Sequence, residues 1–169
     1  MRLLVAIISI ATISFGSLHA SIMIFGKEEM IAQSELIAIV EIQELVTTDK
    51  TKTSADLIAS GHVSRILKGY SKGEIVFRIP RFFPCASFDV STGRHIVFLK
   101  KNGENEYVGV NWYMSYLYMG GKTSRWFDDM GSVIDRKTPI EVINEVEGLL
   151  DEFSDKSLHS DGDERRRSP

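Results

Sequence analysis

The 169-residue sequence has a single cysteine, and this shortage limits what can hold the fold together. Cys85 has no second thiol to pair with, so a disulfide within the chain is excluded and the fold must depend on its hydrophobic core. We interpret Cys85 as a small buried apolar side chain. An intermolecular disulfide and a reactive thiol are the alternatives.

An excess of positive charge is also lacking, because the formal net charge is −3 at pH 7. Proteins that bind nucleic acid need a basic face for the phosphates, which argues against a nucleic-acid partner. A P-loop, a calcium loop and the His-x-His or His-x-x-x-His spacing of metal ligands are missing as well. The sequence therefore predicts no catalytic residue, no metal site and no cofactor.

Long apolar runs are lacking except at the N-terminus, where "LLVAIISIATISF" follows Arg2 and precedes "GSLHA". A positive charge, an apolar stretch and a small residue before the cut are typical of a secretory signal peptide, here residues 1–20 with cleavage after Ala20. A retained membrane anchor is the alternative, although the run is shorter than the roughly 20 residues that a bilayer requires. We expect a periplasmic or secreted mature chain with no stable membrane span after signal cleavage.

Short segments of β-favouring residues follow, separated by polar turns. The second of these alternates, with Leu57, Ala59, Gly61 and Val63 on one face, and the alternation slips near Ile66–Leu67, as at a β-bulge. Gly120-Gly121 predicts a hairpin. The expected elements are a short helix over 27–34, strands over 36–45, 74–79 and 94–101, and a strand within the run 57–70. Further β-favouring segments cover 106–119 and 122–127.

The segment "TPIEVINEVEGLLDEF" changes to helical periodicity. Thr138 and Glu141 have the spacing of a capping box, and Pro139 falls in the first turn, where proline is tolerated. The apolar residues that recur at helical spacing are Ile140, Ile143, Val146, Leu150 and Phe153. We expect this helix to pack on the β-structure of one domain, residues 21–153, and the polar segment 154–169 to be disordered.

Two motifs carry a resemblance to a known family. The sequence "ILKG" (Ile66–Gly69) ends one expected strand, and Cys85 precedes Gly93, which opens the aliphatic strand "HIVFL". In this order they resemble the inhibitor-like oligonucleotide/oligosaccharide-binding (OB) barrels: the tissue inhibitors of metalloproteinases, the netrin module and small bacterial exported proteins. The resemblance covers about residues 30–126. It implies a mainly β fold, a small five-stranded Greek-key (OB-like) barrel, with one C-terminal α-helix added.

The sequence departs from this family at its N-terminus. In the animal inhibitors an N-terminal Cys-x-Cys grips the protease zinc, whereas the mature chain here would begin "SIMIFG". The resemblance therefore does not imply that this chain inhibits a metalloproteinase by binding its zinc. Cys85 matches a position where such proteins often have a cysteine, but its usual partner is absent.

Aromatic residues are concentrated between positions 107 and 127, with Lys122 and Arg125 among them. OB barrels often bind ligands on aromatic and basic surfaces, which makes this segment the candidate binding surface. The alternative is that the rings fill the core. The candidate binding residues are Trp112, Tyr113, Tyr116 and Trp126. His62 and His95 are interpreted as structural residues, and Asp128-Asp129 as a solvated loop.

These observations favour an exported, non-enzymatic binding or interaction module with a protein or glycan partner. A first alternative is a protease-inhibitor-like protein that acts through loops near Phe82-Phe83 rather than by zinc chelation. The others are an enzyme that uses Cys85 or the histidines, and a structural component of the cell envelope.

Overall fold

The computed structural model describes residues 25–49, 51, 55–80, 90–103, 106–128 and 131–164. The expected positions of the signal peptide, of Cys85 and of Phe82-Phe83 lie outside them. The elements in chain order are α1 (Lys27–Gln33), β1 (Leu36–Thr47), β2 (Leu57–Lys68), β3 (Glu74–Ile79), β4 (Gly93–Lys101), β5 (Tyr107–Gly109), the 3-10 helix η1 (Trp112–Ser115), β6 (Tyr116–Tyr118), β7 (Ser124–Phe127), β8 (Val133–Lys137) and α2 (Pro139–Glu164).

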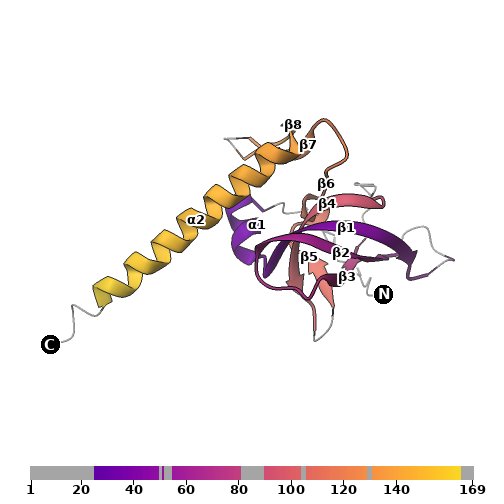
Figure 1. Cartoon of the computed structure of the whole chain (residues 1–169), viewed down its shortest axis with the longest axis horizontal. Helices are drawn as coiled ribbons and strands as arrows, with labels where there is room; N and C mark the ends of the chain where they lie inside the picture. Colours follow the sequence, from indigo (N-terminus) through magenta and orange to yellow (C-terminus); the bar gives the residue numbers. More distant parts are fainter. Residues whose placement is uncertain are drawn as a thin grey trace, which may run out of the picture.

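Five strands close into a small barrel in the order β1-β2-β3-β5-β4, and β4 pairs back with β1 (Figure 1). β3 and β5 are parallel, while the other neighbours are antiparallel. This arrangement confirms the predicted fold class: mainly β, a Greek-key (OB-like) barrel with a C-terminal helix.

The first half of β1, residues 36–40, is buried on both of its faces, which explains why the strand's sequence alternates only in part. Leu36, Ala38 and Val40 belong to the cluster inside the barrel. Ile37 and Ile39, which point the other way, belong to a second cluster outside it. Strands covered on both faces read as nearly continuous apolar runs.

β2 follows the predicted alternation, with Ala59, Gly61 and Val63 buried and His62 exposed. Its pairing with β1 slips one residue at Leu67, because Ile37 lies opposite Lys68 and Ala38 lies opposite Ile66. The predicted irregularity is confirmed. Such extra residues bend the strand and increase its twist, which helps the sheet to close.

Two glycines of β2 and its turn are required by close packing against β1. A Cβ at Gly61 would lie 2.4 Å from the Glu41 carbonyl oxygen, and one at Gly69 would lie 2.1 Å from that of Glu35. Gly69 also has a φ of +83°, a conformation that favours glycine. The close approach to Glu35 and the positive φ explain why the last residue of "ILKG" is a glycine.

The region after β4 differs from the prediction. Residues 106–119 form two short strands with η1 between them, rather than continuous β-structure. The predicted hairpin at Gly120-Gly121 is wrong, because β6 pairs with β4, whereas β7 pairs with β8 in a separate two-stranded sheet. The sequence reasoning did not predict β8.

The outer core lies between the barrel wall formed by β1 and β4 and a cover made of α1, α2 and β7. Ile39 and Phe98 from the barrel contribute to it, together with Met30 of α1, Trp126 of β7 and Val146 of α2. Figure 1 shows α1 between the barrel and α2, and the C-terminal half of α2 projecting away from both.

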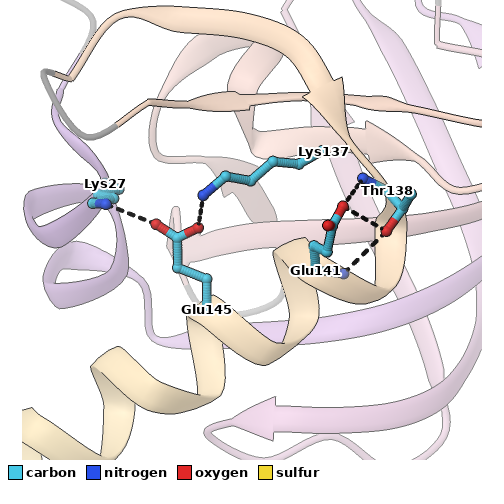
Figure 2. Close-up of polar contacts among 5 residues, drawn as sticks. All are labelled: Lys27, Lys137, Thr138, Glu141 and Glu145. Atoms are coloured by element: carbon cyan, nitrogen blue, oxygen red, sulfur yellow. Dashed lines mark hydrogen bonds and ion pairs between the residues drawn. The ribbon is translucent and has the colours of Figure 1, made fainter.

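The start of α2 is fixed by the predicted capping box. The backbone N–H and the hydroxyl of Thr138 both donate to the Glu141 carboxylate, at 2.7 and 2.8 Å, and the Glu141 N–H is 3.4 Å from the Thr138 hydroxyl (Figure 2). The N–H and hydroxyl of Thr138 hold the pKa of Glu141 below its usual value.

A second carboxylate joins three elements. Glu145 of α2 accepts hydrogen bonds from Lys27 of α1 and Lys137 of β8 (Figure 2). Burial raises the pKa of Glu145, but the two lysines together outweigh it and lower the pKa. The arrangement holds α2 to α1 and to the end of β8.

α2 is also longer than the periodicity predicted. It continues through Glu164 instead of ending near Phe153, so residues 154–164 are helical where disorder was expected. The apolar pattern marks a part of the helix that packs, where Leu149, Leu150 and Phe153 contact the outer core.

Candidate binding site

Two of the four predicted binding residues are core residues. Trp126 is 0% exposed and packs against Phe98 and Phe127, with ring centroids 5.8 and 5.5 Å away. Tyr116 is 6% exposed and stacks on Phe77 at 5.8 Å. These rings cannot contact a ligand at the surface, so the predicted aromatic surface is wrong at both positions.

Tyr116 instead bridges β3 and β5, the neighbouring barrel strands with the fewest paired residues. Its hydroxyl accepts a hydrogen bond from the Gly109 N–H of β5 at 2.8 Å and donates to the Arg78 carbonyl of β3 at 3.0 Å. The register of β3 with β5 has only two residue pairs, Phe77 with Tyr107 and Arg78 with Val108. Burial raises the pKa of the Tyr116 hydroxyl, which therefore stays protonated and can donate.

Of the other two candidates, Tyr113 has a described side chain. Tyr113 is half-buried, and the Arg125 guanidinium lies 5.6 Å from its ring centroid. This distance is typical of a cation–π contact. The Trp112 side chain is not among the described side chains. Of the three candidates with described side chains, two are in the core and Tyr113 contacts Arg125.

The two strand histidines lie on opposite sides of the barrel wall. His62 is on the exposed face of β2, with its Nδ1 3.0 Å from the Glu74 carboxylate. His95 is 1% exposed, its Nδ1 donates to the Gly93 carbonyl at 3.0 Å, and its ring lies 5.2 Å from that of Tyr118. Burial lowers the pKa of His95. Among the described residues, three or more potential metal-binding side chains do not gather anywhere.

A hollow in the described part of the barrel lies between the β2–β3 turn and the β4–β5 turn. We call it the two-turn pocket. Tyr70–Lys72 and Glu74–Val76 line one side, and Lys101, Glu106 and Tyr107 line the other, around a volume of about 390 Å³. That is within the range of roughly 300–1,000 Å³ typical of small-ligand sites.

Two aromatic rings and two lysines give this pocket its chemical character. Tyr70 is 73% exposed and Tyr107 is half-buried. Lys72 and Lys101 make no ion pair with any residue that the structure describes. The pocket can therefore offer a ring face together with positive charge.

The carboxylates of the pocket already have partners. Glu106 accepts from the Arg78 guanidinium at 2.9 Å and from Asn102 at 3.1 Å. Glu74 interacts with His62. An incoming ligand therefore meets carboxylates that already have hydrogen-bond partners, and ammonium groups that make no ion pair with the described residues. This arrangement favours an anionic group on the ligand.

The β2–β3 turn, Gly69–Gly73, also has the spacing Gly-x-Ser-x-Gly, which sequence reasoning overlooked. In hydrolases this motif places the serine on a sharp turn from a strand into a helix. Here it joins two antiparallel strands. No hydrogen bond joins Ser71 to a histidine among the residues that the structure describes. The motif accordingly lacks the context of a nucleophile.

The two-turn pocket was not predicted from the sequence, because "GYSKG" and "NGEN" are two of the polar turns that separate the expected strands. The available signal was a tyrosine and a lysine in the first turn and two lysines just before the second. The OB-like strand order brings these turns together, which no local pattern reveals.

No family model matches the chain, and no curated protein is significantly similar to it. The resemblance to the inhibitor-like OB barrels stays a prediction from the motifs. Within the described parts of the chain, the helices are either too short or too polar to cross a membrane.

Proposed function

We propose that this protein is an exported, non-enzymatic binding module and that the two-turn pocket is its ligand site. The observation that carries the proposal is the pocket itself, where exposed Tyr70 lies with two lysines that make no ion pair among the described residues. Export is supported by the signal-like segment 1–20.

The position of the pocket supports this function. OB barrels bind oligonucleotides and oligosaccharides on the face of strands 2 and 3, together with the loops between strands 1 and 2 and between strands 4 and 5. The two-turn pocket shares with that site the first half of β3 and the ends of the β4–β5 turn, and it adds the β2–β3 turn. The side of the barrel formed by β1 and β4 is covered by the helices and so offers no such surface.

The chemistry of the pocket favours a protein or glycan ligand that carries an acidic group. Tyrosine rings provide apolar faces for a side chain or a sugar. Lys72 and Lys101 can bind a carboxylate or another anion. The net charge of −3 argues against nucleic acid, whose backbone needs an extended basic surface.

The non-enzymatic part of the proposal is supported by the placement of the histidines. A catalytic base must lie within hydrogen-bond reach of its partner. His62 is at the surface and His95 is buried inside the wall, so they do not face a common site.

The proposal is tested with the chain from Ser21 onward on peptide and glycan arrays, followed by measurement of Kd for the strongest ligands. The double variant Tyr70→Ala, Lys101→Ala should weaken binding at least tenfold. The matched control, Val46→Ala with Lys122→Ala, changes two exposed residues away from the pocket and should bind as the wild type does. Equal binding by the pocket variant and the control would assign the ligand to another surface.

A further inference from the structure

The edge of β3 beside the two-turn pocket is only partly paired. β2 pairs with β3 from Glu74 to Ile79. On the other side, β5 pairs only with Phe77 and Arg78. Among the described residues, the segment Glu74–Val76 therefore has a strand neighbour on one side alone, and the pocket lies along this segment.

Alternate residues of β3 direct their backbone N–H and C=O groups toward β2, and the residues between them direct theirs toward the open side. The Val63 N–H donates to the Gly73 carbonyl at 2.6 Å, and Gly61 lies opposite Ile75. In an antiparallel pair the hydrogen-bonded positions alternate, so Glu74 and Val76 take the positions whose backbone groups point away from β2. Arg78, two residues after Val76, takes the same kind of position, and its carbonyl points away from β2 and accepts from the Tyr116 hydroxyl.

The side chains beside this edge are exposed as well. Val76 is 50% exposed although it is a valine in a strand. Open strand edges are templates for pairing with another chain, and natural proteins usually cover or charge them. Here an exposed valine lies between the partnered carboxylate of Glu74 and the ion-paired Arg78.

We propose that an extended acidic peptide adds as a short strand to the β3 edge at Glu74–Val76, with a side-chain carboxylate at Lys72 and Lys101. This inference rests on the proposed function, whose ligand class it specifies. Main-chain hydrogen bonds to the edge provide the binding mode, and alternate side chains enter the pocket. The open segment has room for about three residues, roughly 10 Å at the strand rise.

Charge complementarity selects the peptide. Within the described chain the two lysines of the pocket have no ion-pair partner, while Glu106 is ion-paired with Arg78 and Glu74 is hydrogen-bonded to His62. A peptide carboxylate would give the lysines an ion pair. A basic peptide would find its carboxylate partners already occupied.

The first test uses two synthetic hexapeptide libraries, acetylated and amidated, that differ only in one fixed position, glutamate or lysine. The glutamate library should bind the protein at least tenfold more tightly, and the Tyr70→Ala, Lys101→Ala variant should lose this binding. Equal binding of the two libraries would overturn the acidic class.

The second test examines strand addition with the tightest-binding glutamate peptide. N-methylation at one set of alternate residues removes the N–H groups that face β3, and should weaken binding at least tenfold. N-methylation at the other set should leave it unchanged. On the protein, Val76→Pro removes an edge N–H without breaking the pairing with β2, and should weaken binding to a similar degree. Val76→Thr, which keeps the N–H and the shape, should not.

The outcomes separate this inference from the proposed function. If the pocket variant abolishes binding while no methylated peptide does, the pocket is the ligand site and strand addition is overturned. If glycans bind in the pocket and neither library does, the peptide class is overturned and the proposed function stands. If the pocket variant binds every ligand as the wild type does, both fail. Circular dichroism shows whether the Val76→Pro variant is folded. If it is not, the N-methylated peptides, tested on the wild-type protein, decide whether the peptide adds as a strand.

Discussion

The covered and the open side of the barrel differ in what their outward-facing residues do. On the covered side, Ile39 of β1 and Phe98 of β4 point away from the barrel and are fully buried under α1, α2 and β7. On the open side, His62 of β2 and Val76 of β3 point outward and remain exposed. One alternating strand pattern thus builds a second core on one side and leaves a surface available for binding on the other.

The largest effect should come from breaking the covered side. Trp126→Ala removes a fully buried ring from the outer core and should lower the free energy of unfolding by about 3–5 kcal/mol. Val76→Ala on the open side should change it by less than about 0.5 kcal/mol, because Val76 is half exposed. Urea unfolding of both variants measures the difference, and similar losses would contradict the division into two sides.

The next largest loss of stability should come from the junction of β3 with β5, which the Tyr116 hydroxyl bridges. Tyr116→Phe keeps the stacked ring but removes the hydroxyl between Gly109 and Arg78. Leaving these backbone groups without their partner should cost about 1–3 kcal/mol. Tyr70→Phe removes an exposed hydroxyl and serves as the matched control, with no measurable loss expected. A Tyr116→Phe variant as stable as this control would show that the junction does not need the hydroxyl.

A smaller effect should follow from pH. Burial lowers the pKa of His95 from its ordinary 6.5, so the unfolded chain takes up a proton at a higher pH than the folded one does. The contribution to stability is therefore complete above about pH 6.5 and falls as the pH drops toward the folded-state pKa. Urea unfolding at pH 7.5 and pH 5.5 should show a weaker pH dependence for His95→Leu than for the wild type. The same slope in both would contradict the buried, neutral histidine.

The smallest effect on stability should come from the two-turn pocket. Tyr70 and Lys101 are exposed and the Lys101 ammonium makes no ion pair among the described residues. The double variant Tyr70→Ala, Lys101→Ala should therefore unfold within about 0.5 kcal/mol of the wild type. A loss above 1 kcal/mol would mean that the pocket residues support the fold, and the binding tests would then need single variants.

Much of the barrel could be predicted because strand alternation and turn residues are local signals. The slip at Leu67 and the start of α2 at the Thr138–Glu141 capping box were visible for the same reason. The end of α2 could not be predicted. Segment 154–164 is polar, so it has no apolar periodicity that would mark it as helical.

The candidate site was predicted poorly because exposure is a property of the tertiary structure. A tryptophan at position 126 has the same local signature whether it covers the barrel or faces solvent. The outer core exists because α1 and α2 return from distant parts of the sequence. Tyr70 and Lys101 likewise come together only when β3 and β5 pair.

The central claim is that the open side of the barrel binds the ligand while the covered side maintains the fold. Amide chemical shifts of the ¹⁵N-labelled chain, recorded during titration with the tightest-binding glutamate hexapeptide, test it most directly. We predict that the shifts concentrate in residues 70–76 and 101–107. Shifts confined to β7, β8 and α2 would contradict the account.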